Sequence, residues 1–250
     1  MVLVVGGHRV KRGQLPWHAG VYRRTVTPYQ QICGGSLVSN NVVISASQFA
    51  VAVGKLYRPW DNPVDQAQKS DVKVIHLPER YQGAGAHDQD DIAVLVVARE
   101  FQFNTYVRPV CLDFNYHFEV QQLYPGNHGK VAGWGLTAAN GNVSSVLQVV
   151  DLPYVDIRTC INNSPPEFGE YITSDKICAG TLEPDTALCR GDSGGGLAYS
   201  SSPMGAERYY LRGVASTAPS SDNACTTAAY TSFTSITKHE QFIKQFWIEP

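Results

Sequence analysis

The apolar residues of this chain fall in short runs rich in Val, Ile and Tyr, and glycines and prolines separate one run from the next. The chain has 22 Gly and 14 Pro among its 250 residues, and its longest apolar run extends only from Ile92 to Ala98. Runs of this length are typical of β-strands joined by turns, and they are too short to cross a bilayer as a helix. The sequence therefore predicts an all-β fold.

The segments with the length and composition of strands form two groups along the chain. They are residues 31–38, 41–46, 49–55, 72–77 and 92–97, and then 130–134, 147–152, 196–199, 209–216 and 228–233. The polar, turn-rich residues 113–128 lie between the two groups. A closing helix is the only clear helix signal, with helical spacing of Ile236, His239, Phe242, Ile243 and Phe246. Two β units would place a substrate groove between them.

The charges and the cysteines bear on the partners and the compartment of the protein. The formal net charge is −2 and the sequence has no block of Lys or Arg, so neither nucleic acid nor an anionic membrane is favoured as a partner. The six cysteines form no Cys-x-x-Cys pair, which argues against a zinc ribbon or redox motif and favours disulfides. We expect an extracellular protein without metal or other cofactor. Residues 1–5 are too short for a signal peptide, so we expect any leader upstream of them.

The segment 189–196 carries the strongest chemical signal. The glycines around Ser193 let the backbone turn sharply and leave the serine hydroxyl exposed. The N–H groups of Gly191 and Ser193 can point at one spot, where they would stabilise the oxyanion of an acyl-transfer intermediate. A loop rich in Gly and Ser is weak support on its own, because ordinary turns use the same residues.

Further motifs occur in order around this loop, and together they identify a family. They are Val4-Val5-Gly6-Gly7, Pro16-Trp17, Cys33-Gly34-Gly35-Ser36-Leu37, Asp91-Ile92-Ala93-Val94-Leu95, Arg108-Pro109-Val110-Cys111-Leu112, Gly133-Trp134-Gly135 and Ile177-Cys178-Ala179-Gly180. This order resembles the trypsin/chymotrypsin family of serine proteases, and within it the modular serine proteases of insect haemolymph immune cascades. The resemblance implies two six-stranded antiparallel β-barrels with the active site between them. It implies one peptidase domain over residues 4–250, with barrels at 4–112 and 128–234, a connection at 113–127 and a terminal helix at 235–250.

The resemblance also implies a role for each matched residue. Ser193 would be the nucleophile, and Asp91 the buried carboxylate that orients the base. The N–H groups of Gly191 and Ser193 would form the oxyanion hole. Cleavage after Leu3 would free the α-amino group of Val4, which would pair with Asp192 and organise the oxyanion loop. With residues 1–3 attached, the chain should therefore resemble a zymogen.

The cysteines acquire partners by the same resemblance. It pairs Cys160 with Cys178 and Cys189 with Cys225. Cys111 matches a cysteine that often bonds an upstream chain. Cys33 matches a cysteine whose partner lies beside the base histidine, and that partner is missing here. We therefore expect Cys33 and Cys111 to be unpaired in this chain.

The base histidine is itself missing. In this family it follows the strand after the Cys-Gly-Gly-Ser-Leu motif, where this chain reads Val43-Ile44-Ser45-Ala46-Ser47-Gln48-Phe49. Gln48 stands in the place of the histidine, and the next strand begins several residues early, so a single deletion near Ser47 explains these losses. Glutamine accepts no proton at physiological pH, and losing the base of a related triad costs on the order of 10⁶ in kcat.

Three interpretations remain open. The first is a catalytically dead domain, either a pseudoprotease that acts by binding or an incomplete splice product. The second is an active endopeptidase with an unrecognised base; His87, which precedes Asp91, is the one histidine expected near the groove, and we expect it on the rim. The third is a β module with a coincidental serine loop, against which the ordered motifs argue. We favour the first.

The specificity pocket would be apolar. By resemblance Ala187, Leu188, Ala218 and Ala228 line it, and Ala187 lies at its floor where trypsin-like members carry an acidic residue. Such a pocket cannot compensate a buried Lys or Arg, so it should take a Leu- or Val-sized side chain of a protein or peptide substrate or inhibitor. Without the resemblance, core packing would be the simpler interpretation of these residues. Lys55 lies where calcium-binding relatives carry glutamate, so no calcium site is expected.

Overall fold

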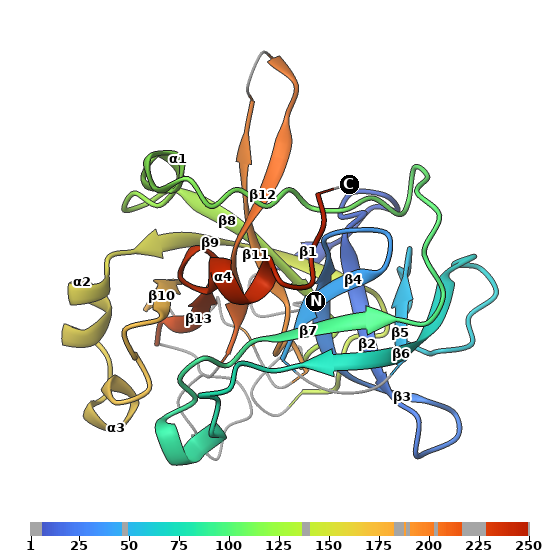
Figure 1. Cartoon of the computed structure of the whole chain (residues 1–250), viewed down its shortest axis with the longest axis horizontal. Coiled ribbons are helices and arrows are strands. Elements are labelled where there is room, and N and C mark those ends of the chain that lie inside the picture. The colour runs from blue at the N-terminus through green and yellow to red at the C-terminus, as the bar shows by residue number, and fades with distance from the viewer. Residues whose placement is uncertain are drawn as a thin grey trace.

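Two closed antiparallel β-barrels of six strands each lie side by side in the molecule (Figure 1). The structure is a computed structural model that describes residues 7–46, 50–136, 141–182, 188, 191–202, 205–216 and 229–249. The barrels confirm the fold class expected from the sequence. The residues between them, 113–127, pass from the first barrel to the second.

The first barrel has the strand order β2-β3-β4-β7-β6-β5. Its strands are β2 (His18–Arg23), β3 (Gln30–Leu37), β4 (Val42–Ser45), β5 (Ala50–Val53), β6 (Gln68–His76) and β7 (Ala93–Val97). Strand β2 was not predicted from the sequence, because His18, Gly20 and Arg23 interrupt the apolar run by which other strands are recognised. The register is antiparallel throughout, for example Ile44 opposite Val94.

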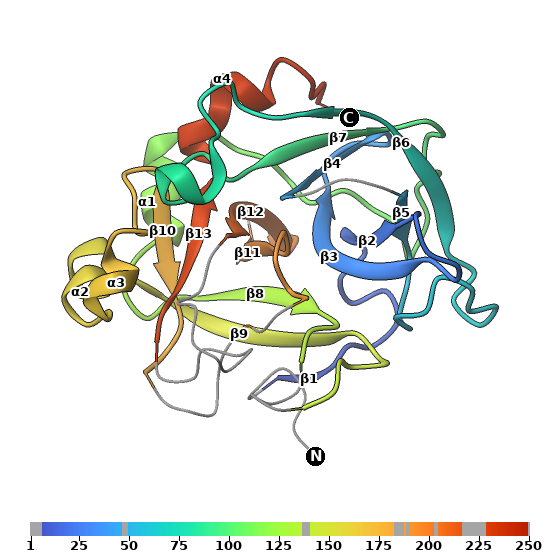
Figure 2. The same cartoon turned by 90° about the horizontal axis from the view of Figure 1, so that it is seen from below.

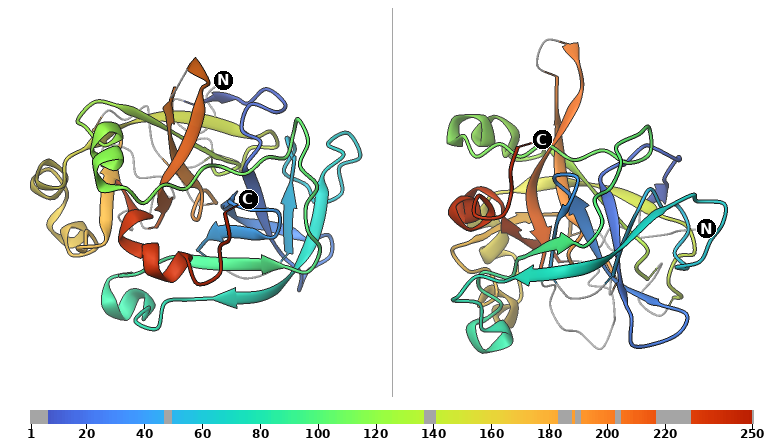
Figure 3. Two further views of the ribbon diagram at one scale, coloured as in Figure 1. Left: turned by 45° about the horizontal axis from the view of Figure 1, so that its top comes forward. Right: turned by 45° about the vertical axis from the view of Figure 1, so that its right-hand side comes forward.

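The second barrel has the order β9-β10-β13-β12-β11-β8, and pairing of β8 with β9 closes it. Its strands are β8 (His128–Gly133), β9 (Gln148–Val155), β10 (Lys176–Ala179), β11 (Gly196–Ser201), β12 (Arg208–Ala215) and β13 (Thr231–Ser235). The short β1 (His8–Arg9) pairs with β9. Residues 8–9 thus extend the second barrel (Figure 2), although the predicted boundaries assign them to the first. The hairpin of β11 and β12 projects beyond both barrels (Figure 3).

The closing helix expected from the sequence is present, and the described residues contain further helices that gave no clear signal in the sequence. The helices are α1 (Tyr116–Gln122), α2 (Ile157–Asn162), α3 (Pro166–Gly169) and α4 (Glu240–Ile243), with 3-10 turns η1 (Gly83–Ala86) and η3 (Thr237–His239). Asn115 and Asp156 cap α1 and α2 by accepting backbone N–H bonds. Such caps stabilise short helices that lack an apolar period. The terminal helix is shorter than 235–250, because β13 runs to Ser235 and α4 ends at Ile243.

Three apolar clusters explain why several strands are apolar on both faces. One cluster fills each barrel, and a third contains residues of both barrels and joins them. In β4, Val43 belongs to the interior of the first barrel, whereas Val42 and Ile44 belong to the joining cluster. A strand buried on both faces reads as a continuous apolar run rather than an alternating one. The runs at 42–44 and 92–97 therefore mark the side of the first barrel that packs on the second.

His18 lies at this junction of the barrels. It comes from β2, its ring packs 4.9 Å from the ring of Trp134 of the second barrel, and it is 5% exposed. Its Nε2 atom is buried and has no hydrogen-bond partner among the described residues. Burial of the ring disfavours the charged form and lowers the pKa of His18 from 6.5 to about 4. The packed barrels therefore favour the neutral form of this histidine.

His18 should make the protein sensitive to acid. Below about pH 6.5 the unfolded chain binds a proton at this residue that the folded chain does not, so stability falls as the pH falls toward 4, by about 3 kcal/mol in all. The His18→Gln variant should lose this part of the acid sensitivity. Urea denaturation at pH 7 and pH 4 measures it, and the exposed His128→Gln serves as the control that keeps the wild-type dependence. An unchanged pH dependence in His18→Gln would contradict the assignment.

Candidate active site

The backbone of Ser193 and Gly194 lies between the two barrels and is bonded to both. The N–H of Gly34 on β3 donates to the carbonyl of Ser193 at 2.8 Å, and the N–H of Gly194 donates to the carbonyl of Ala215 at 2.8 Å. Ser193 itself is exposed. The loop therefore presents its hydroxyl to solvent while its main chain is fixed from either side.

Gly194 is the residue that makes this close approach possible. Its φ is +78°, which is left-handed, and a Cβ there would lie 2.6 Å from the carbonyl oxygen of Gly34 and 2.6 Å from Oγ of Ser45. Side chains rarely tolerate such a conformation, and a backbone oxygen cannot move aside as a flexible side chain can. Ser45 is already fixed, because its hydroxyl donates to Gly34 O at 2.7 Å.

Asp192 is turned inward, away from the exposed Ser193. It is 1% exposed, and its Oδ1 accepts a 2.8 Å hydrogen bond from the N–H of Gly135. A Cβ at Gly133 or Gly135 would lie about 2 Å from this carboxylate, at 1.9 and 2.2 Å respectively. The Gly133-Trp134-Gly135 motif thus makes room for a buried carboxylate. Leu3 and Val4, the residues expected to activate Asp192, lie outside the described residues.

Asp91 precedes β7 of the first barrel, but two of its partners come from the second. Its Oδ2 accepts a 2.7 Å hydrogen bond from Ser216, and its carbonyl accepts a 2.8 Å bond from the hydroxyl of Thr234. Burial raises the pKa of Asp91, against the hydrogen bond from Ser216 and the charge of Lys176, which lower it. Ser216 directly follows Ala215, which bonds Gly194. Ala215 at the end of β12 and Ser216 directly after it therefore bring the serine loop and Asp91 together.

The seven histidines of the chain are all described, and none hydrogen-bonds to the side chain of Asp91 or Ser193. His8 is exposed on β1, His128 is exposed on β8, and His117 is exposed on α1. The ring of His76 stacks on Phe246, with centroids 3.7 Å apart. His18 and His239 are buried against other groups.

His87, the one histidine expected near the groove, is directed elsewhere. Its Nδ1 lies 3.7 Å from Oε2 of Glu170, and its ring meets the ring of Tyr171 edge-on at 5.4 Å. The side chain is 48% exposed. Its position beside residues 170–171 fits an exposed rim residue better than a base between Asp91 and Ser193.

The structure describes some of the predicted pocket residues and cysteines. Gln48, Ala187, Ala218, Ala228, Cys189 and Cys225 lie outside the described residues. Leu188 is 6% exposed and packs in the apolar cluster of the second barrel. Cys160 and Cys178 form a disulfide with a Cα–Cα distance of 6.3 Å. Cys111 is a half-buried free thiol, and burial raises its pKa.

Lys55, at the position where calcium-binding relatives carry glutamate, forms a buried ion pair in the loop of residues 55–65. Its ammonium lies 3.1 Å from Oδ2 of Asp65, and both side chains are 1% exposed. The ammonium also donates to the carbonyl of Pro59 at 2.8 Å, and Asp65 accepts from the N–H of Leu56 at 2.9 Å. Desolvation lowers the pKa of Lys55, and the bond to Asp65 opposes this. The lysine thus places a positive charge inside the 55–65 loop.

The polar residues that fix Asp91 were not predicted from the sequence; they are Ser216, Thr234 and Lys176. Each stands in a strand or at a strand end, where single Ser, Thr or Lys residues carry no recognisable pattern. Gln31 was not predicted either; its amide donates to the carbonyls of Cys33 at 3.0 Å and Gly191 at 3.1 Å. The one signal that the sequence offers for these residues is a polar side chain within a strand, which needs a hydrogen-bond partner where it is buried.

The two barrels, the serine loop bonded to both of them and the buried Asp91 define a trypsin-like serine protease domain. A sequence model of the trypsin family matches residues 4–243, and the chain belongs to that family.

Curated relatives support the same placement. A modular serine protease of Drosophila melanogaster is 28% identical over 238 residues, which cover 87% of this chain and 36% of that protein. Clotting factor C of Tachypleus tridentatus is 28% identical, over 96% of this chain and 25% of that protein. The venom serine protease Bi-VSP of Bombus ignitus is 32% identical, over 78% of this chain and 56% of that protein. The chain thus matches about a quarter to a half of the length of these relatives. No helix in the described ranges is long and apolar enough to traverse a bilayer.

Gly194 should be intolerant of any side chain. Gly194→Ala combines a left-handed φ with contact to a backbone oxygen, so it should destabilise the fold by roughly 3 kcal/mol or more. Gly85→Ala is the matched control, because a Cβ there meets nothing within 4 Å and should be neutral. Urea denaturation followed by circular dichroism compares the two. Equal stability of both variants would show that the loop does not pack between the barrels as described.

Lys55 should contribute strongly to stability. Lys55→Met leaves the buried Asp65 carboxylate without its cation, which costs roughly 3–5 kcal/mol. The control is Lys69→Met, because Lys69 pairs with Asp61 on the surface, where the two side chains are 31% and 76% exposed. Exposed pairs contribute about 1 kcal/mol or less. Thermal unfolding of both variants tests this, and a Lys55→Met protein as stable as Lys69→Met would refute it.

Proposed function

We propose that this chain is a trypsin-family domain without effective hydrolytic activity that acts by binding protein or peptide partners in an extracellular immune cascade. The observation that carries the proposal is the set of partners around Asp91. Its carboxylate interacts with the hydroxyls of Ser216 and Tyr81, and none of the chain's histidines bonds to it. Without an imidazole between Asp91 and Ser193, nothing accepts the proton of the serine hydroxyl.

The expected loss of activity is large. In a related triad, removing the base lowers kcat on the order of 10⁶, or roughly 8 kcal/mol of transition-state stabilisation. The fixed loop and groove do not depend on the base, so binding of a peptide or an inhibitor survives its loss. An apolar pocket would favour a Leu- or Val-sized side chain.

Partners upstream of this chain are part of the proposal. The relatives are two to four times longer than the region they share with the chain, except the venom protease. Cys111 lies beside β12, where its N–H donates to Tyr209 O and its carbonyl accepts from Leu211 N, both at 3.0 Å. A disulfide from this thiol would attach an upstream regulatory chain on the side of the β11–β12 hairpin. Names such as clotting factor C support a cascade role.

The competing candidate is an active endopeptidase with an unrecognised base. One observation favours it: Ser193 is exposed in a loop whose backbone is intact. A base would then have to come from residues such as His87, whose ring faces Glu170 and Tyr171 instead.

A fluorophosphonate probe separates the two candidates. We expect no labelling of Ser193 in the purified chain, because the probe reports an activated serine, while far-UV circular dichroism shows a folded β protein. An active trypsin-family protease is the positive control, Ser193→Ala the negative control, and Gln48→His tests whether an imidazole at that position restores labelling. Strong labelling of the wild-type chain that Ser193→Ala abolishes, or turnover of a peptide ester, would establish the active candidate.

A further inference from the structure

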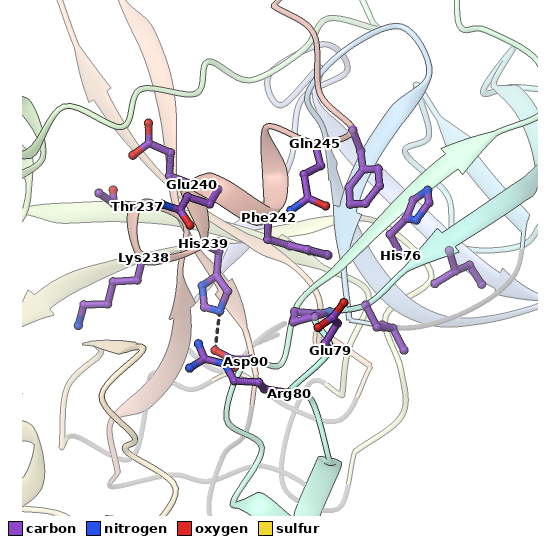
Figure 4. A pocket seen from close by; sticks show the side chains of 15 residues that line it. His76, Glu79, Arg80, Asp90, Thr237, Lys238, His239, Glu240, Phe242 and Gln245 are labelled. Atoms are coloured by element: carbon purple, nitrogen blue, oxygen red, sulfur yellow. Dashed lines mark hydrogen bonds and ion pairs between the residues drawn. The ribbon is translucent and has the colours of Figure 1, made fainter.

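His239 of the terminal helix is buried beside a carboxylate that directly precedes Asp91. Its Nδ1 lies 2.7 Å from the carbonyl oxygen of Ser235, and its Nε2 lies 3.0 Å from Oδ1 of Asp90. The side chains of His239 and Asp90 are 5% and 4% exposed. Figure 4 shows the imidazole reaching from the terminal helix toward Asp90, with Arg80 beside it.

The two contacts fix where the hydrogens must be. A carbonyl oxygen only accepts, so Nδ1 of His239 carries a hydrogen. In a neutral imidazole the other nitrogen then carries a lone pair, and this lone pair would face a carboxylate oxygen at 3.0 Å. Two acceptors at that distance repel each other unless a hydrogen lies between them. His239 and Asp90 must therefore hold one proton more than a neutral imidazole beside a carboxylate.

The surrounding charges place this proton on His239. The other carboxylate oxygen of Asp90 lies 3.3 Å from Nε of Arg80, which favours an ionised Asp90. Asp175, which directly precedes β10, accepts a 3.0 Å bond from the N–H of Asp90 and pairs with Lys176 at 2.9 Å. The groove over the pair, of about 900 Å³, is also lined by Glu79, Lys238 and Glu240. Counting Asp91, carboxylates outnumber cations here, which favours an imidazolium.

The turn that this pair holds is the one that presents Asp91. Asp88 and Asp90 have φ of 54° and 57°, a left-handed conformation that side chains adopt only when surrounding bonds enforce it. Lys176 donates to the carbonyl of Asp88 at 2.6 Å. These bonds tie the turn to β10, and the bond from His239 ties it to the terminal helix.

We propose that His239, held as an imidazolium, latches the terminal helix to the turn of residues 88–91 through Asp90, and that loss of its proton loosens this turn. His239 and Asp90 are then positioning residues for Asp91. The latch does not depend on whether the domain hydrolyses peptides, because it concerns the position of a carboxylate that the fold retains either way.

The latch has a definite pH dependence. An imidazole in an unfolded chain loses its proton around pH 6.5. Above that pH, and until the folded pair also releases its proton, the folded chain binds one proton more than the unfolded chain. Stability therefore falls as the pH rises through this window, by up to tenfold in the folding equilibrium per pH unit, or about 1.4 kcal/mol.

The protonation state is tested by NMR of the histidine rings in the intact ¹⁵N-labelled chain. At pH 7.5 we expect both ring nitrogens of His239 to carry hydrogens. His239→Gln assigns the resonances. A neutral His239 ring at pH 7.5, protonated only at Nδ1, would overturn the proposal.

The consequence for stability and for the turn is tested with Asp90→Asn. An asparagine amide can donate a hydrogen to neutral Nε2, so this variant keeps the bond without the extra proton. Between pH 6.5 and 8.5, urea denaturation should show a steeper loss of stability in the wild type than in Asp90→Asn. Arg80→Met removes only the exposed ion pair of Asp90 and should keep the wild-type slope. Equal slopes for wild type and Asp90→Asn would refute the latch.

Hydrogen exchange gives the local readout. In the wild type, amides of residues 88–92 should lose protection between pH 6.5 and 8.5 after correction for intrinsic exchange, and in Asp90→Asn they should not.

Asp90, Asp175 and His239 also lie close enough together to suggest a metal. Both oxygens of Asp175 are already bonded, to Thr173 and to Lys176 and the Asp90 amide. If equimolar Zn²⁺ raises the unfolding temperature and Asp90→Asn abolishes this, the cluster is a metal site and the latch is wrong.

Discussion

The arrangement of this domain depends on two backbone hydrogen bonds that hold the serine loop between the barrels, one from Gly34 to Ser193 and one from Gly194 to Ala215. They require the main chains of the two barrels to approach so closely that no Cβ fits at Gly194. The neighbouring features follow from that approach. Asp192 must turn into the space that Gly133 and Gly135 leave open. Ser216, next to Ala215, is brought to the carboxylate of Asp91.

Most of the strands and the serine loop could be predicted because their signals are local, whereas β2 and β10 were not predicted. A strand buried on both faces, such as β4, reads as an apolar run, and a serine flanked by glycines reads as a sharp turn. Helix α1 was missed because its stability comes from the Asn115 cap rather than from an apolar period. The partners of Asp91 were missed because Ser216 and Thr234 are more than a hundred residues away along the chain, at 125 and 143 positions. Only the packing of one barrel on the other brings them together.

The partner of His239 could not be predicted from the sequence either. Its helical spacing with Ile236 and Ile243 predicts a residue on the buried face of the closing helix, and it is buried. The spacing does not reveal that this histidine meets a carboxylate. His18 is buried as well, but against Trp134 and without a charged partner, so it must stay neutral. The two buried histidines thus have different surroundings: His18 packs on an aromatic ring, and His239 lies against a carboxylate.

The bonds that shape the candidate site involve backbone groups, hydroxyls and carboxylates, and none of them requires an imidazole between Asp91 and Ser193. Asp91 is desolvated, which raises its pKa, but Ser216 and the nearby Lys176 compensate part of that cost. The fold and the geometry of the serine loop are therefore held by groups other than a histidine between Asp91 and Ser193. The Gly-Asp-Ser-Gly loop reflects how the two barrels pack. Whether its serine is a nucleophile depends on a separate group, the neighbour that accepts the proton of its hydroxyl.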